Sequence, residues 1–402
     1  MTRINLLLRT LITSLLFVLL MGTAFPGLVS AQTVEVVDEG VEYVYGKFIV
    51  FNARLDPPIP VEKALIAFRS SGEQDTQVYD VEVDPEGLLT YTYEQSSRPL
   101  SAFTTIEYRF TLTLEDGTEV KSQPFTFFYD DNRFDWKSIE RGSVTVRWYE
   151  GGTELGENVI DTVQQGLDRA RTILDVVSPG QLLINVYASS SDMMAVLSPN
   201  GNGWVVGHAD PGLDVIVAAL PPGPDQRLQT EQRIPHELMH VLLYQKTGAG
   251  YTNIPAWLNE GLASMAELYP DPDYQILLEN AVKEDRLLPL ASLCQSFPSD
   301  SYGLPLAYAE STYFTRYLYR QYGSSSLETL IAAYTDGLSC QRGIESAYGS
   351  TLENLENEWR QAAFGQAAAA KVDFQELLPW LVVLSAVLLL PLVVTIASLR
   401  RR

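Results

Sequence analysis

The chain has 402 residues, of which 46% are hydrophobic and 19% are charged, as is typical of globular proteins. Its 50 acidic side chains outnumber the 28 basic ones and give a net charge of −22. No basic patch with interleaved aromatic residues is present, and such an acidic surface repels a phosphate backbone. Nucleic-acid binding is therefore excluded.

Residues 1–31 have the features of a secretory signal peptide. Arg3 and Arg9 lead into the apolar run LITSLLFVLLMGTAF, and the small residues of VSA stand just before Gln32. We expect the mature chain to begin near Gln32.

Residues 33–130 alternate in short β-rich runs such as EYVYGKFIVFNARL, KALIAFRS and IEYRFTLTLEDG, with turn residues between them. About seven short strands at this spacing predict a β-sandwich of the immunoglobulin or fibronectin type. The region has no histidine or cysteine, so it is a spacer or a binding module, whose protein partner the sequence does not identify.

Residues 139–365 combine strands and helices. The runs SVTVRWYE, QLLINVYAS and DVIVAAL (214–220) predict strands, and residues 157–177 form an amphipathic helical pattern. Further helices are expected at 230–246, 255–268, 307–322, 325–334 and 351–364. Strands first and helices afterwards predict an α+β domain.

The C-terminal end predicts a membrane anchor. Residues 366–376 form a short tether, and the uncharged residues 377–399 are long enough for one transmembrane helix. Arg400, Arg401 and Arg402 form a cytoplasmic tail by the positive-inside rule. The expected location is therefore the cell membrane, single-pass, with the N-terminal part outside the cytoplasm; the alternative for 377–399 is a buried core helix.

Cys294 and Cys340 are the only cysteines. Outside the cytoplasm such a pair favours a disulfide, and two free buried thiols are the alternative. Neither has the paired spacing of a metal ligand.

The stretch PHELMH, residues 235–240, carries two of the three histidines of the chain. On a helix His236 and His240 lie on one face, while the neighbouring Glu237 reaches a water beside a shared metal ion. Neutral imidazole suits zinc, and a catalytic zinc site needs a third protein ligand and an open position. Glu260, in the helical run NIPAWLNEGLASMAE after a short turn, supplies that ligand.

HELMH at 236–240 and WLNEGLASMAE at 257–267 resemble the gluzincin zinc peptidases, the clan of thermolysin and the aminopeptidase N-like enzymes. The resemblance implies a thermolysin-like domain with one catalytic zinc ion bound by His236, His240 and Glu260. It also implies Glu237 as general base and a peptide or protein as substrate. The strand 214–220 would be the edge strand that pairs with an extended peptide.

Three further residues have open roles. Glu267 resembles the acid that orients ligands in related enzymes, or is a solvated glutamate. Tyr308 resembles the catalytic tyrosine that stabilises the oxyanion, or packs in the core, and His208 is another oxyanion candidate or a loop histidine. The GxMEN segment of aminopeptidase N-like enzymes is missing, which favours an endopeptidase.

The sequence thus predicts a membrane-anchored zinc metallopeptidase that acts outside the cytoplasm. One alternative is a catalytically silent surface-binding module on a peptidase-like scaffold. The other is a zinc hydrolase of a non-peptide amide or ester.

Overall fold

The computed structural model of the chain describes residues 34–365 apart from 72–74, 96–98, 198–206 and 211. These described residues divide into two compact units, one up to Arg133 and one from Phe134 onward. The predicted signal peptide (1–31), tether (366–376), transmembrane helix (377–399) and tail (400–402) lie outside the described residues.

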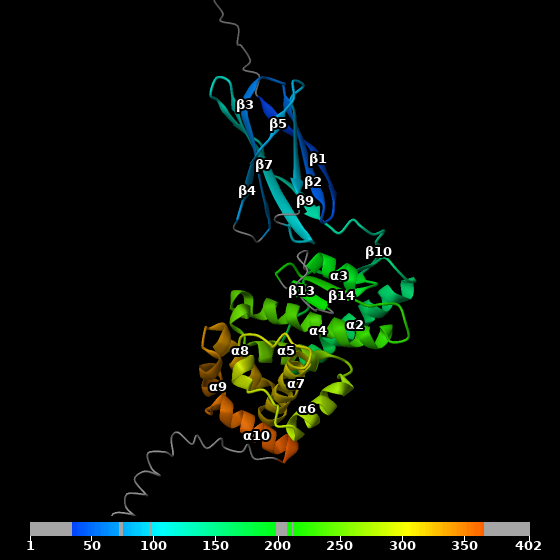
Figure 1. Ribbon diagram of the computed structural model, residues 1–402, viewed down its shortest axis with the longest axis vertical. Helices are drawn as coiled ribbons and strands as arrows, with labels where there is room; N and C mark the ends of the chain where they lie inside the picture. The colour runs from blue at the N-terminus through cyan, green and yellow to red at the C-terminus, as the bar shows by residue number, and fades with distance from the viewer. Residues whose placement is uncertain (1–33, 72–74, 96–98, 198–206, 211, 366–402) are drawn as a thin grey trace, which may run out of the picture. The chain divides into compact units, whose positions relative to one another are not determined.

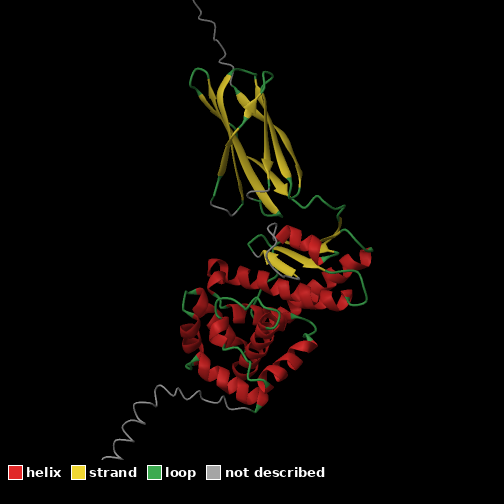
Figure 2. Ribbon diagram, in the orientation of Figure 1, coloured by secondary structure: helices red, strands yellow, loops and turns green. Residues whose placement is uncertain are grey.

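The first unit is built from antiparallel strands in two sheets (Figure 2). One sheet has the order β1 (Glu35–Val44), β2 (Phe48–Asp56), β6 (Leu88–Glu94), β5 (Glu82–Val83). The other has the order β4 (Gln77–Asp80), β3 (Val61–Ser70), β7 (Thr104–Leu114), β8 (Glu119–Lys121), and β9 (Phe125–Tyr129) also pairs with β7.

Alternation of buried and exposed residues along the strands gives each sheet one apolar face. Phe51 of β2 and Phe68 of β3 are fully buried and stack with ring centroids 5.0 Å apart, so the apolar faces of the two sheets meet. The structure therefore has a two-sheet core here, and the immunoglobulin or fibronectin type stays a prediction.

The second unit begins with a five-stranded sheet. Its order is β10 (Lys137–Arg141), β11 (Val144–Trp148), β12 (Leu182–Tyr187), β14 (Val215–Ala219), β13 (Gly207–Asp210). Strands β11, β12 and β14 are parallel, whereas β10 and β13 are antiparallel to their neighbours at the two edges. Helix α2 (Thr153–Ile173) connects β11 to β12, and α3 (Ser190–Leu197) follows β12.

The predicted fold class, α+β with strands first and helices afterwards, is wrong, because the structure is a mixed α/β fold. Parallel neighbours cannot be joined by a hairpin, so the helix expected at 157–177 is a crossover between β11 and β12. The same prediction included a C-terminal transmembrane helix. No helix among the described residues is long and apolar enough to cross a membrane, and 377–399 falls outside them.

The remaining elements are helical (Figure 1). They are α4 (Gln226–Thr247), η1 (Gly248–Asn253), α5 (Ala256–Ala266), α6 (Pro272–Lys283), η2 (Leu290–Leu293), α7 (Gly303–Tyr322), α8 (Ser324–Thr335), α9 (Cys340–Tyr348) and α10 (Leu352–Phe364). The rings of Trp257, Phe314 and Trp359 pack at centroid distances of 5.2 and 5.8 Å and join α5, α7 and α10 in one core. Helix α5 is thereby held in the middle of the unit.

The edge of the sheet also differs from the expectation. The run at 214–220 was expected to be the edge strand, but β14 lies between β12 and β13 and all its residues are buried. The edge strand on this side is β13, which includes His208 and pairs with β14 from Gly207 to Asp210. A completely apolar strand is typical of the inside of a parallel sheet, and VIVAA fits that position.

Candidate metal centre

His236 and His240 lie one turn apart on α4, with ring centroids 5.1 Å apart. Their neighbours Leu238, Met239 and Val241 are fully buried, so the helix is fixed by its apolar side while the two imidazoles face α5. The spacing of four residues predicted this shared face.

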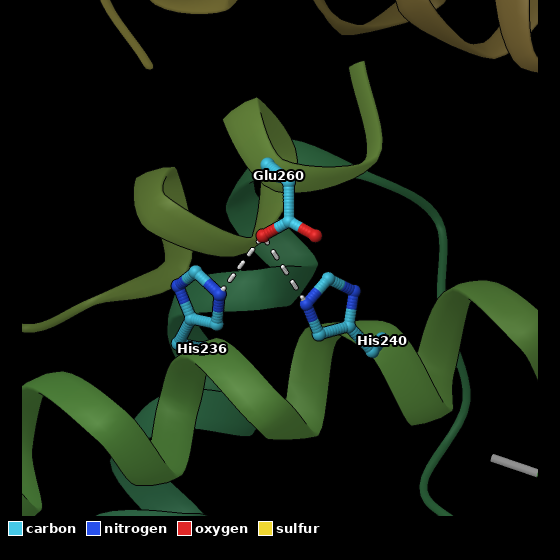
Figure 3. Close-up of side chains that lie close together, drawn as sticks. All are labelled: His236, His240 and Glu260. Atoms are coloured by element: carbon cyan, nitrogen blue, oxygen red, sulfur yellow. Dashed lines mark ion pairs between the residues drawn. The ribbon is translucent and has the colours of Figure 1, made fainter. Parts of the chain in front are cut away.

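Glu260 of α5 points at both rings (Figure 3). Its Oε2 atom lies 3.3 Å from Nε2 of His236 and 3.7 Å from Nε2 of His240. One ligand atom from each of the three residues lies within 4.8 Å of the others, and the same Glu260 Oε2 is buried without a hydrogen-bond partner. Two imidazole nitrogens and an orphaned carboxylate oxygen are the donors that zinc prefers, so the residues fit a zinc ion.

The far side of each imidazole meets a hydrogen-bond acceptor. Nδ1 of His236 lies 3.1 Å from Oε1 of Glu267, and Nδ1 of His240 lies 3.1 Å from Oδ1 of Asn259. A proton on each Nδ1 satisfies these contacts and leaves the Nε2 lone pairs directed at Glu260. Outer contacts of this kind fix the orientation of metal-binding histidines.

Charges in the centre favour a cation. Burial alone would raise the pKa of Glu260, but the adjacent His240 and His236 lower it. Burial opposes ionisation of His236, yet the neighbouring carboxylates of Glu260, Glu267 and Glu237 raise its pKa well above the usual value. For His240 burial dominates and lowers the pKa. Glu237, the candidate general base, is buried beside them with 7% exposure.

Helix α5 is held at its start by the disulfide region. Cys294 and Cys340 form a disulfide, as predicted. The carbonyl of Cys294 accepts a hydrogen bond from Ala256 N at 3.0 Å, and the indole of Trp257 donates to Cys340 Sγ at 3.4 Å. The first turn of α5, just before Glu260, is therefore fixed to two distant parts of the chain.

Tyr308 of α7 lies next to the centre. Its ring is half-buried, with its centroid 6.4 Å from that of His236 and 5.1 Å from that of Phe297. Burial and the nearby carboxylates of Glu260 and Glu237 raise the pKa of Tyr308, so its hydroxyl is protonated and can donate a hydrogen bond.

The other predicted residues have different outcomes. Glu267 is buried against His236 and is not a solvated glutamate. His208 lies on the edge strand β13, where the structure describes the backbone only, and its role stays a prediction.

Sequence reasoning missed three residues around the centre. Asn259 stands directly before Glu260 and contacts His240, and Tyr251 of η1 lies with its hydroxyl 3.3 Å from Nδ1 of His240. Tyr274 of α6 is close enough that, in addition to burial, Glu267 and Glu260 raise its pKa. Of these three residues, only Asn259 could have been identified from the sequence, because it belongs to the WLNEG motif.

The HExxH helix and a glutamate on the following helix define a metallopeptidase type of centre. Residues 162–365, just over half of the chain, match the family model of the Peptidase MA superfamily. The chain belongs to this superfamily, and the predicted relation to the gluzincin metallopeptidases is confirmed. The second unit is thus a zinc-peptidase type of scaffold.

Solved structures with some likeness are distant. An M1 zinc metallopeptidase from Deinococcus radiodurans is 11% identical, with a TM-score of 0.35 over 81% of this chain and 92% of that one. An aminopeptidase N family protein from Idiomarina loihiensis is 8% identical, with a TM-score of 0.30 over 86% and 75%. A purple acid phosphatase from yellow lupin (Lupinus luteus) seeds is 10% identical, with a TM-score of 0.20, and this chain spans only 28% of its length. No curated protein matches the chain.

Proposed function

We propose that the chain is a zinc-dependent metallopeptidase that hydrolyses peptide bonds. The observation that carries this proposal is the convergence of His236 Nε2 and His240 Nε2 on the orphaned, buried Oε2 of Glu260. These three residues would hold the zinc ion. Membership of the Peptidase MA superfamily supports the same reaction class.

Zinc, when bound, supplies a Lewis acid that polarises the substrate carbonyl and lowers the pKa of water. Glu237 follows His236 on α4 and acts as the general base that takes a proton from the attacking water. The same carboxyl then returns the proton to the leaving amine nitrogen. Tyr308 donates its hydroxyl hydrogen to the oxygen on which negative charge develops.

The substrate would bind along β13. Among the described residues this strand pairs on one side only, with β14, and α4 packs next to it. An extended peptide could pair with its free edge through main-chain hydrogen bonds, which demand little of the substrate sequence. Together with the missing GxMEN segment, this favours an endopeptidase.

The enzyme would work outside the cytoplasm. The Cys294–Cys340 disulfide supports this location, because disulfides persist in oxidising compartments. The signal-like residues 1–31 favour the same location. Accessibility of the folded unit to added protease in intact cells tests this, and complete protection would contradict it.

The central experiment compares Glu237→Gln with the wild type. The amide keeps the size of the side chain but cannot take a proton, so we expect zinc to bind as before and cleavage of an unfolded protein substrate to fall at least 100-fold. His240→Ala should instead lose the zinc. Glu345→Gln changes an exposed glutamate on α9 and is the matched control, with both properties unchanged.

Retained cleavage in Glu237→Gln would reject the assigned base. Stoichiometric zinc in the wild type without cleavage of any peptide would favour a silent binding module or a hydrolase of another amide or ester. A wild-type chain that binds no zinc would reject the proposal.

A further inference from the structure

Pro235 lies inside helix α4, immediately before His236. A proline has no backbone N–H, and its ring presses on the carbonyl four residues earlier. In α4 that carbonyl belongs to Glu231, which therefore lacks the N–H of residue 235 as its donor. The buried proline ring also sits against α2, because a Cβ added to Gly166 would lie 3.1 Å from Pro235 Cβ.

The Glu231 carbonyl accepts a hydrogen bond from outside its own helix. It accepts a hydrogen bond of 3.0 Å from the backbone N–H of Leu268, two residues beyond the last residue of α5. The nearby Met265 carbonyl accepts from Nε of Arg169 of α2 at 3.2 Å. The C-terminal end of α5 is therefore held by both α4 and α2.

Glu267 lies between the end of α5 and the anchored Leu268. Its backbone is extended, with φ −53° and ψ 136°, and its buried carboxylate contacts Nδ1 of His236 at 3.1 Å. Any shift of Leu268 would move the residue before it. The contact that orients His236 thus depends on a hydrogen bond that begins at the Glu231 carbonyl.

We propose that Pro235 is a positioning residue for the metal centre. Because Pro235 has no N–H, the Glu231 carbonyl is free to accept the hydrogen bond from Leu268 N, and this bond holds Glu267 in contact with His236. The proposal rests on the metal site of the proposed function. Any other residue at 235 would bring an N–H that competes with Leu268 for the same carbonyl. The residue before the HExxH motif would then control the ligand geometry through the end of the next helix.

Three variants of the full-length protein test this. Pro235→Ala restores the helical donor, and Leu268→Pro removes the competing one, with Glu267 already in a conformation that suits the residue before proline. Leu268→Ala keeps the N–H and is the matched control. Two readouts are measured: Zn²⁺ affinity by competition with a chromophoric chelator, and the Nδ1–H signal of His236 in zinc-free protein by ¹⁵N NMR. The His236 signal can be assigned readily, because the chain has only three histidines.

We expect Pro235→Ala and Leu268→Pro each to bind Zn²⁺ about 10-fold more weakly, the usual effect of losing an outer contact, and to change the His236 signal. Leu268→Ala should behave as the wild type. The double variant should be no weaker than the weaker single one, because both changes break the same link.

Two results would overturn the proposal. One is wild-type affinity and an unchanged His236 signal in Leu268→Pro or in a folded Pro235→Ala, and the other is an equal loss in Leu268→Ala and Leu268→Pro. Should Pro235→Ala fail to fold by circular dichroism, the two Leu268 variants still decide between these outcomes. A wild-type chain without zinc affinity would reject the proposed function, while the His236 signal of the zinc-free variants would still test the role of Pro235.

Discussion

Oδ1 of Asn259 lies 3.1 Å from Nδ1 of His240, and the same amide donates through Nδ2 to the hydroxyl of Tyr251 at 3.0 Å. Tyr251 thereby fixes the amide of Asn259, and the amide orients the imidazole of His240. With the Nδ1 proton directed at the amide oxygen, the Nε2 lone pair of His240 faces Glu260. A residue next to one ligand in the sequence thus orients a second ligand on another helix.

Replacement of Asn259 by alanine should weaken Zn²⁺ binding by 10-fold to 100-fold, the range typical of outer contacts to a metal-binding histidine. Tyr251→Phe is the matched comparison, because it keeps the amide oxygen that faces His240 and removes only the hydroxyl, which lies 3.3 Å from the same Nδ1. We expect a smaller effect there. Titration of both variants against a competing chelator measures the difference, and equal losses would place the orienting role on Tyr251.

Gly261 follows Glu260 at the point where α5 meets α7. A Cβ at this position would lie 2.2 Å from Oγ1 of Thr315 and 2.6 Å from the carbonyl oxygen of Ser311, and the latter is backbone that cannot turn away. We expect Gly261→Ala to destabilise the fold by about 1–3 kcal/mol and to lower Zn²⁺ affinity, because the helix that carries Glu260 must shift.

Urea unfolding and metal titration of Gly261→Ala check both effects. The control is Gly180→Ala, since a Cβ at Gly180 meets nothing within 4 Å. Wild-type stability in Gly261→Ala would show that α5 and α7 are not in tight contact.

The convergence of His236, His240 and Glu260 was predictable from sequence because its signal is local. His236 and His240 are one helical turn apart, and Glu260 follows after one short turn in a motif with few alternatives. The partner of each imidazole was harder to predict. For Glu267 the sequence left two roles possible, because the sequence does not show whether a glutamate at a helix end is buried. Tyr251 was not predicted, because it belongs to the short η1 turn, which has no periodic pattern.

The sheet was harder to predict because its order depends on contacts far apart in sequence. The apolar run of β14 suits a buried strand, yet sequence alone does not reveal that the short β13, only four residues long, covers its outer side. Helix α6 was missed as well, because only two of its residues, Leu278 and Ala281, are buried. Parallel pairing of β11, β12 and β14 turned the expected α+β order into a mixed fold.

Tyr308→Phe should lower kcat about 100-fold and leave Zn²⁺ affinity near that of the wild type. The hydroxyl is the only part removed, and loss of one hydrogen bond to a developing oxyanion costs 100-fold to 1,000-fold in kcat. Tyr313→Phe on the same helix is the control, because it keeps the ring that contacts Arg316. Full activity of Tyr308→Phe would return this tyrosine to a packing role and leave the oxyanion to another group.

Glu310 of α7 is completely buried. Its Oε1 accepts a hydrogen bond from Leu288 N at 2.8 Å, and its Oε2 has no partner. Nearby, Glu356 accepts from Leu290 N at 3.2 Å and pairs with Arg360. Burial, assisted by the charge of Glu356 and opposed by the Leu288 hydrogen bond and the charge of Arg360, raises the pKa of Glu310 to about 8.

This pKa makes stability depend on pH. The unfolded group titrates near its ordinary value of 4.5, so between pH 4.5 and 8 the folded state holds a proton that the unfolded state has lost. The free energy of unfolding should fall as pH rises through this range, by up to about 1.4 kcal/mol per pH unit.

Glu310→Gln keeps an acceptor for Leu288 N and removes the titration, so its unfolding free energy should fall less steeply. Urea unfolding from pH 5 to 8.5 measures the slope, with Glu345→Gln as the exposed control, and identical slopes in all three proteins would show that Glu310 is ionised in the folded state.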